Sequence, residues 1–394
     1  MCIAQYNILF LYSSAIDPFK GGVESVTSEL SSYFISKGSS CYYLSLYKNN
    51  SNNIMQFNLP NSVNFYNQEN IAFVLKFVKD KNINILINQG GISKDCSQLS
   101  YVVKPYGIKI VSCIHNSLLD TVRNFDILYY NKFKKYKLEK FLFLTKIKLV
   151  KKILYTLYYL KYTNHYRKLY ENSDKIVLLS DSFKKDFFFF VNELTDKVCS
   201  IPNPIPLKIS ESKLYDVKEN ILLYVGRIDT LHKKVDFLLK FWSLLHKKHK
   251  DWKLVIVGGG NELEMMKEYA NSLCLTNVYF EGFQEPLSYY KKASIFCMTS
   301  ASEGFGIVLV EAMNMGLLPV AFDSFPAVKD IIDDGINGIL VPPFDIKLYA
   351  EKVSCLIENV EERMFITKKA YEKSQKFHLD EIGYRWMVLF SSLF

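Results

Sequence analysis

The sequence predicts an α/β protein made of two Rossmann-like domains, and two observations support this prediction. The chain has 394 residues, which exceeds the size at which a single hydrophobic core usually stops growing. Apolar runs of strand length alternate with segments of helical period through both halves, which is typical of parallel sheets covered by helices. Because 49% of the residues are hydrophobic, we expect the chain to fold throughout.

Five strands are predicted in each half. They cover 7–12, 41–46, 83–88, 109–115 and 175–180, and then 220–226, 253–258, 278–282, 295–299 and 318–321. Pro202, Pro204 and Pro206 separate the halves, since prolines this dense remove the backbone donors that a helix or central strand needs. We therefore expect an N-terminal domain over 1–205, a linker over 206–218 and a C-terminal domain over 219–375. A last helix, 376–394, should pack back on the body.

The net charge of +9 is concentrated in one segment. Residues 129–168 carry 12 Lys and Arg but a single acidic residue, Glu139. Within the wider segment 117–170, apolar residues recur at steps of four and three, which predicts an amphipathic basic helix in the N-terminal domain. These apolar residues are Phe143, Ile147, Val150, Leu154 and Leu157.

Two interpretations of this basic segment stay open. The helix packs on its domain with a solvated lysine face, or residues 132–152 bind an anionic membrane surface. Charges every few residues exclude a membrane-spanning helix. We expect no nucleic-acid partner, because no nucleic-acid-binding motif accompanies the charge.

The cysteines indicate the compartment. All eight are scattered without a Cys-x-x-Cys pair or a histidine at zinc spacing, so we expect free thiols in a reducing environment. The first residues lack the cationic start of a signal peptide. The expected location is the cytoplasm, with a peripheral position at the inner face of the membrane if the basic segment binds lipid.

The most specific motif follows the strand predicted at 295–299. Residues 303–311 read EGFGIVLVE, in which Gly304, Phe305 and Gly306 precede a helix-forming run. Glycines let the backbone approach a ligand, and a helix N-terminus favours anions. The pattern indicates a phosphate-binding loop with two carboxylates, Glu303 and Glu311, that accept hydrogen bonds from sugar hydroxyls.

This motif resembles the Glu-x7-Glu element of the family-4 retaining glycosyltransferases. Two further elements of the same family resemble stretches of the second half. A strand ending in Gly226-Arg227 is followed by Lys233 before an apolar helix, and another strand ends in three glycines, 258–260. Three matches in order are more specific than any one alone.

The resemblance implies the GT-B fold, in which two Rossmann-like domains face each other across a cleft. It implies that Arg227 and Lys233 bind the donor diphosphate, Glu303 the transferred sugar and Glu311 the ribose. It also implies donor contacts from a set of loop residues: Gly226, Gly258, Gly304, Phe305 and Gly306, with Phe283 beside the base. Where the family has glycine after the lysine, this chain has Lys234, so either lysine can be the one that reaches the phosphate.

The first half resembles the family less densely. Gly21 and Gly22 resemble the loop that faces the donor phosphates, and His115, at the end of a strand, resembles a histidine near the transferred sugar. For each, an ordinary structural role is the alternative.

Together these features predict a retaining hexosyltransferase of bacterial surface polysaccharide biosynthesis. Its donor would be a UDP- or GDP-linked sugar, and its acceptor a glycan or lipid-linked glycan. No cofactor and no metal are expected, because no Asp-x-Asp motif accompanies the donor elements and protein cations can stabilise the leaving group. Alternatives are a glycoside phosphorylase or inverting transferase of the same fold, and a non-catalytic module that binds sugar nucleotides or nucleic acid.

Overall fold

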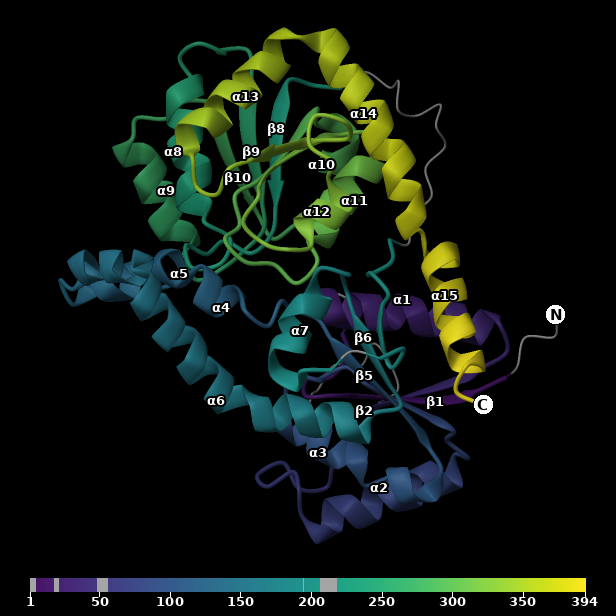
Figure 1. The fold of residues 1–394 in the computed structure, drawn as a ribbon. Coiled ribbons are helices and arrows are strands. Elements are labelled where there is room, and N and C mark those ends of the chain that lie inside the picture. The colour runs from purple at the N-terminus through teal and green to yellow at the C-terminus, as the bar shows by residue number, and fades with distance from the viewer. Residues whose placement is uncertain (1–4, 18–20, 48–55, 194, 206–217) are drawn as a thin grey trace. The chain divides into compact units, whose positions relative to one another are not determined.

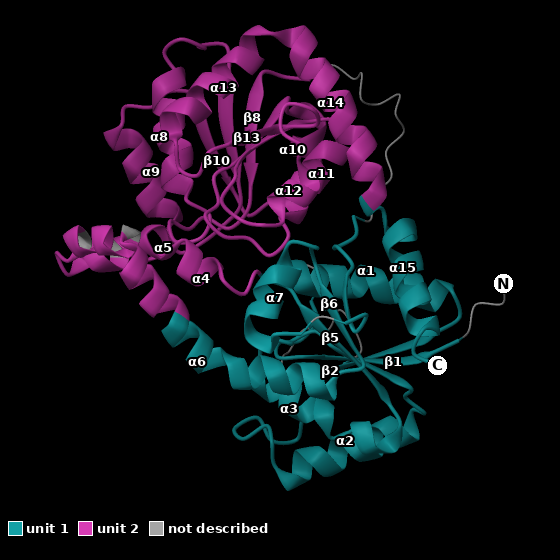
Figure 2. Ribbon diagram, in the orientation of Figure 1, with its two compact units in different colours: residues 1–116, 156–206, 377–394 teal, residues 117–155, 207–376 magenta. Residues whose placement is uncertain are grey.

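The computed structural model describes residues 5–17, 21–47, 56–193, 195–205 and 218–394. The chain forms two compact units (Figure 2). Unit 1 comprises 1–116, 156–206 and 377–394, and unit 2 comprises 117–155 and 207–376. The predicted linker, 206–218, lies outside the described residues except for Lys218.

Unit 1 is built on a parallel sheet, which Figure 1 shows with its covering helices. The seven strands of this sheet have the order β3-β2-β1-β4-β5-β6-β7. Its strands are β1 (Asn7–Tyr12), β2 (Ser40–Ser45), β3 (Phe57–Asn58), β4 (Ile85–Asn88), β5 (Lys109–Ile114), β6 (Lys175–Leu178) and β7 (Val198–Ser200). The five strands predicted for the first half are confirmed, each within two residues of its expected bounds. The sequence did not reveal β3 and β7, which are too short to carry a strand-length apolar run.

Helices connect the strands of unit 1. They are α1 (Gly22–Ser36), α2 (Gln68–Asp80), α3 (Lys94–Tyr101), the 3-10 turn η1 (Lys104–Tyr106), the second half of α6 (Lys148–Asn172) and α7 (Phe183–Val191). The last helix of the chain, α15 (Leu379–Ser391), follows unit 2 in sequence and also belongs to unit 1. The last helix, α15, packs on α1 through aromatic rings, with Phe390 5.1 Å and Trp386 6.4 Å from the ring of Phe34. Burial of these large rings accounts for the docking of α15 on this unit.

Unit 2 contains a six-stranded parallel sheet with the order β10-β9-β8-β11-β12-β13. This order is that of open dinucleotide-binding sheets, in which ligands bind at the carboxyl ends of the strands. The strands are β8 (Ile221–Val225), β9 (Lys253–Val257), β10 (Val278–Gly282), β11 (Ile295–Met298), β12 (Leu318–Phe322) and β13 (Ile339–Val341). The five predicted strands are again confirmed, and β13, of three residues, is additional.

The helices of unit 2 bury one face each. In α8 (Val235–Leu245), for example, Val235, Leu238, Leu239 and Trp242 recur with helical period and are fully buried. The others are α9 (Leu263–Ser272), α10 (Leu287–Lys292), α11 (Ile307–Asn314), α12 (Val328–Ile331), α13 (Ile346–Glu358), α14 (Val360–Ser374) and the 3-10 turn η4 (Gln375–Phe377).

The basic segment differs from its prediction in two respects. It forms α4 (Asp120–Arg123), α5 (Phe125–Lys135), the 3-10 turn η2 (Glu139–Lys146) and α6 (Lys148–Asn172), and residues 117–155 group with unit 2 rather than with the first domain. Because α6 begins at Lys148, Phe143 and Ile147 precede the helix and cannot share a helical stripe with Leu157. No helix in the described part of the chain is long and apolar enough to cross a bilayer.

Candidate functional site

Glycines join the ends of neighbouring strands in unit 2. The Gly226 N–H donates to the carbonyl of Val257 (3.0 Å), and the Gly258 N–H donates to the carbonyl of Gly282 (2.7 Å). Gly258 has a φ of 143°, and a Cβ atom there would lie 1.9 Å from the Gly226 oxygen. Only glycine fits at this position. Two loops that the sequence identified separately therefore lie against each other.

The loop after β8 is organised by Asp229. Its carboxylate accepts hydrogen bonds from the backbone N–H groups of His232 (2.6 Å) and Lys233 (3.0 Å) and from Nε of Arg227 (2.8 Å). Burial alone would raise the pKa of Asp229, but these backbone donors and the guanidinium lower it below its ordinary value. Asp229 thus stays ionised and fixes both predicted phosphate-binding cations on one loop.

Lys233 and Glu303 are in direct contact. The Lys233 Nζ lies 2.6 and 2.7 Å from the two carboxylate oxygens of Glu303, and the Ser300 hydroxyl donates to the same carboxylate (2.6 Å). The Glu303 side chain is only 10% exposed, whereas that of Arg227 is 63% exposed. The site therefore combines a shielded, charge-assisted pair with an accessible guanidinium.

Lys234, which follows Lys233 in the chain, directs its ammonium group to a different partner. It has left-handed backbone angles (φ 52°, ψ 46°), and its buried Nζ donates to the carbonyl of Ile127 (2.9 Å). Burial lowers the pKa of Lys234. A left-handed lysine costs about 1 kcal/mol, and here its side chain ties α5 to the body of unit 2. Of the two lysines, Lys233 is the one beside Glu303.

The loop before α11 contains the predicted glycines. Gly306, with a φ of 86°, precedes the helix, and the side chain of Phe305 is buried. Glu311 lies on the second turn of α11, where the hydroxyl of Tyr290 donates to its Oε2 (3.0 Å). Burial raises the pKa of Glu311. Because this carboxylate lies on a different element from Glu303, the two glutamates can serve different parts of one ligand.

Phe283 follows β10 and is 76% exposed. The side chain of Phe283 is therefore not packed in the core. Its position next to the glycine loop after β9 leaves the aromatic face available to a planar group.

The segment that precedes α5 lies on the loop that carries Glu303. The Asn124 amide donates to the carbonyls of Ala301 (2.7 Å) and Ser324 (2.8 Å), and the Ser302 hydroxyl donates to Asp120 (3.1 Å). Asn124 is buried. These polar contacts, together with the Lys234 contact, explain why residues 117–155 group with unit 2.

Gly21 and Gly22 belong to unit 1 and begin α1. Gly21 is the residue before the helix, in extended conformation, and a Cβ atom there would lie 2.5 Å from the Glu24 carboxylate. Burial raises the pKa of Glu24. Gly22 has nothing within 4 Å of the position of a Cβ atom, so a substitution there meets no steric conflict.

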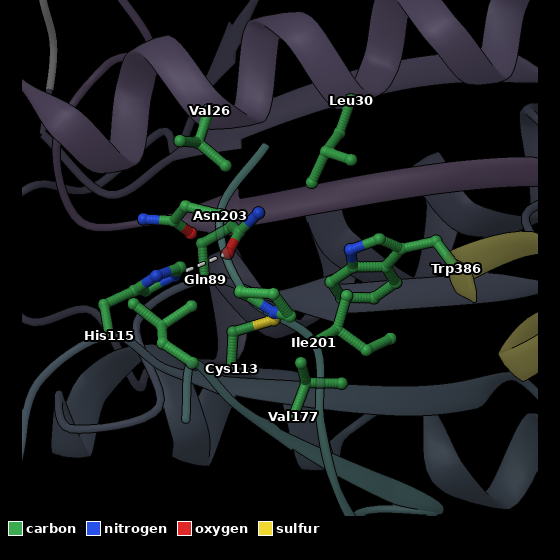
Figure 3. Close-up of a pocket in the computed structure, with 11 residues that line it drawn as sticks. Val26, Leu30, Gln89, Cys113, His115, Val177, Ile201, Asn203 and Trp386 are labelled. Atoms are coloured by element: carbon green, nitrogen blue, oxygen red, sulfur yellow. Dashed lines mark hydrogen bonds between the residues drawn. The ribbon is translucent and has the colours of Figure 1, made fainter. Parts of the chain in front are cut away.

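His115 follows β5 in unit 1 and borders a small cavity of about 10 Å³ (Figure 3). Its Nε2 is 2.7 Å from Oε1 of Gln89, which follows the neighbouring strand β4, and its buried Nδ1 has no hydrogen-bond partner among the described residues. Asn203 also lines the cavity, together with apolar side chains such as Leu30 and Trp386. Gln89 and His115 thus form a polar pair beyond the carboxyl ends of the adjacent strands β4 and β5.

Burial lowers the pKa of His115 to about 4. The imidazole is therefore neutral at physiological pH, where it donates through Nε2 to Gln89 and keeps Nδ1 as an acceptor. This state suits a hydrogen bond to a sugar hydroxyl better than the neutralisation of a phosphate.

Three residues that contribute to this geometry were not identified as site residues from the sequence: Asp229, Tyr290 and Gln89. An aspartate between an arginine and a lysine in a loop is a recognisable signal for a turn that binds backbone N–H groups. Tyr290 and Gln89 carry no such local signal, since their partners are far away in the chain. Among the described residues, no group of three or more His, Cys, Asp and Glu is arranged to hold a metal ion.

Known proteins resemble this chain in sequence and in fold. Residues 207–373 match the model of the family described as Glycosyl transferases group 1. An uncharacterized glycosyltransferase from Haemophilus influenzae is 34% identical over 215 residues, which are 54% of this chain and 60% of that protein. A Campylobacter jejuni protein, named as an α-1,4-N-acetyl-D-galactosaminyltransferase acting on a diphosphoundecaprenol-linked glycan, is 25% identical over 58% of this chain and 62% of its own length.

The chain thus spans about three fifths of the length of these two relatives. The solved structure of the Anabaena protein HepE with UDP and glucose matches 98% of this chain and all of its own, with a TM-score of 0.72 and 17% identity. Residues 207–373 are thus similar to the glycosyl transferases group 1 family, and the two parallel sheets of the chain have the architecture of the GT-B fold.

Proposed function

We propose that this protein is a retaining glycosyltransferase that moves a hexose-type sugar from a UDP- or GDP-linked donor to a glycan or lipid-linked glycan. The enzyme would act in the biosynthesis of a bacterial surface polysaccharide. The observation that carries the proposal is the convergence of Arg227, Lys233 and Glu303 beside the glycine loops of unit 2. The named substrate of the Campylobacter relative supports the lipid-linked acceptor.

The proposed chemistry is a front-face displacement. The bond from the anomeric carbon to the donor phosphate breaks, a bond to the acceptor oxygen forms on the same face, and the acceptor proton passes to the leaving phosphate oxygen. Arg227 and Lys233 stabilise the negative charge that develops on the diphosphate, because fixed cations act most strongly where charge appears during reaction. Glu303 would accept hydrogen bonds from hydroxyls of the transferred sugar. The reaction would need no metal ion.

Donor binding can be tested without knowing the acceptor. Among UDP-, GDP- and ADP-sugars, one nucleotide class should raise the melting temperature by about 5 °C at 100 times its Kd. Glu311→Ala should lose most of this increase, because the ribose contact is removed. Failure of every nucleotide sugar to stabilise the wild-type protein would contradict a donor site.

The remaining alternatives give different products. A glycoside phosphorylase would consume inorganic phosphate, and an inverting enzyme would form a β-linkage from an α-linked donor. A non-catalytic module would bind the donor without ever releasing the nucleoside diphosphate. Product analysis with the donor identified above distinguishes these cases.

We also propose that the basic segment holds the enzyme at the cytoplasmic face of an anionic membrane. The lysines from 132 to 152 whose side chains are described are exposed. Leu149, Ile153, Leu157 and Leu160 form an exposed apolar row on α6, each at least 50% exposed. A row of apolar side chains beside lysines suits a leaflet with anionic headgroups. The seven cysteines within the described residues are free thiols, which supports a reducing compartment.

Membrane binding should depend on these lysines and on salt. Each lysine near an anionic surface contributes about 1 kcal/mol, so replacing Lys148, Lys151 and Lys152 by glutamate should weaken binding about 100-fold or more. Co-sedimentation with phosphatidylglycerol vesicles measures this effect, and vesicles of phosphatidylcholine alone should bind poorly. The same change at exposed lysines of α13, Lys347 and Lys352, is the control. Equal binding by all variants, at low and high salt, would contradict the proposal.

A further inference from the structure

Glu311, the carboxylate assigned to the ribose, has a partner on a neighbouring helix. Tyr290, on α10, donates its hydroxyl to Oε2 of Glu311 at 3.0 Å. The tyrosine ring is buried and lies 6.1 Å from the ring of Phe296 on β11. A buried phenol hydroxyl needs a hydrogen-bond partner, and a carboxylate is a strong one.

The position of Tyr290 is fixed by contacts other than its own hydroxyl. Nζ of Lys218 donates to the backbone carbonyls of Tyr290 (3.1 Å), Lys291 (2.9 Å) and Met315 (2.8 Å). These carbonyls lie at the last residues of α10 and just after α11, where helices leave acceptors without intrahelical partners. One ammonium group thus links the ends of the two helices that carry Tyr290 and Glu311.

The hydrogen bond from Tyr290 favours the charged form of Glu311. Burial is the main cause that raises the pKa of Glu311, and nearby Glu285 raises it further, whereas the hydrogen bond from Tyr290 lowers it. Burial, with the adjacent Glu311 carboxylate, also raises the pKa of Tyr290, so the phenol stays protonated and remains a donor. Of these three causes, which are burial, Glu285 and the hydrogen bond from Tyr290, the hydrogen bond is the one that favours the ionised carboxylate.

We propose that Tyr290 is the positioning residue of the nucleotide site: through its hydrogen bond it orients the Glu311 carboxylate toward the ribose hydroxyls. A carboxylate accepts from the two vicinal hydroxyls of ribose when it is charged and held in one rotamer. Tyr290 would therefore determine the preference for ribonucleotides over deoxyribonucleotides without touching the ligand. This inference rests on the proposed role of Glu311 in donor binding.

The test compares neighbouring tyrosines on the same helix. Tyr290→Phe removes only the hydroxyl on Glu311, whereas Tyr289→Phe removes an equivalent bond to Glu281 (3.0 Å) and is the matched control. Calorimetric titration with UDP, GDP and their 2′-deoxy forms should show the ribonucleotide bound about tenfold more weakly by Tyr290→Phe. Affinity for the 2′-deoxy form should change less, and Tyr289→Phe should resemble the wild type.

The pH dependence gives a second readout. Nucleotide affinity should fall as pH decreases through the pKa of Glu311, because a protonated carboxyl accepts fewer hydrogen bonds. Since the Tyr290 bond lowers that pKa, its loss in Tyr290→Phe should move the fall to higher pH. A change in packing alone would leave the midpoint of this titration in place.

The outcomes separate this inference from the proposed function. If Glu311→Ala loses the preference for ribonucleotides while Tyr290→Phe keeps both the preference and the wild-type pH midpoint, the role of Tyr290 is wrong and that of Glu311 stands. If Glu311→Ala itself keeps the preference, the ribose assignment fails and the inference fails with it. A weakened preference in Tyr290→Phe, together with a midpoint at higher pH, supports both.

Discussion

The Arg227→Ala variant should turn over the donor about 100-fold more slowly than the wild type, with an unchanged melting temperature. Removal of one preorganised charge contact typically costs this much in rate. The guanidinium is 63% exposed and pairs, among the residues that the structure describes, with Asp229 of its own loop, so its contribution to folding is small. Release of nucleoside diphosphate into water, which requires no acceptor, measures the rate. Lys240→Ala, which breaks a surface pair with Asp236, is the control.

Lys233→Ala and Glu303→Ala should also reduce turnover, but the structure predicts a different effect on stability. Because these two side chains pair at 2.6 Å in a shielded position, removing one leaves the other without its counter-ion. Each single variant should therefore melt at a lower temperature, whereas Arg227→Ala should not. A wild-type rate for Arg227→Ala or Glu303→Ala would show that the site is wrongly placed.

Gly258→Ala should destabilise unit 2 by about 3 kcal/mol, because alanine is strained at a φ of 143° and its Cβ would collide with the Gly226 carbonyl. The adjacent Gly259→Ala is the matched control. A Cβ atom at 259 would lie 3.6 Å from Phe283, which is an ordinary contact. Chemical denaturation and nucleotide titration of both variants measure the difference.

Gly259→Ala should keep the stability of the wild type, and Gly258→Ala should lose both stability and nucleotide binding. Equal stability of the two variants would mean that the close approach of the two loops is not required. In that case the contact between the loops that contain Gly226 and Gly258 would not be needed to hold the donor site in place.

The strands and the donor motifs could be predicted because they depend on local sequence. Apolar runs of four to seven residues indicated ten strands within two residues of their bounds, whereas β3, β7 and β13, of two or three residues, lack any such run. The contact between Gly226 and Gly258 follows from parallel strands that end at one edge. Local patterns therefore account for the frame of the site.

The partners of the site residues could not be predicted, because they come from distant parts of the chain. Nothing near Glu311 in the sequence indicates that Tyr290 reaches it, and nothing near His115 indicates Gln89. The basic segment was assigned to the first domain by its position in the chain. Its buried contact through Asn124 to the loop after β11 depends on tertiary structure alone.

The most direct test of retaining transfer at this site is the configuration of the product that forms without metal ions. The wild-type protein, with the α-linked donor that stabilises it, EDTA and methanol as a small acceptor, should form the methyl α-glycoside and release the nucleoside diphosphate. Proton NMR distinguishes this product from the β-anomer, and methyl glycosides do not interconvert in water. A methyl β-glycoside, or complete loss of activity in EDTA that added magnesium restores, would contradict the proposed chemistry.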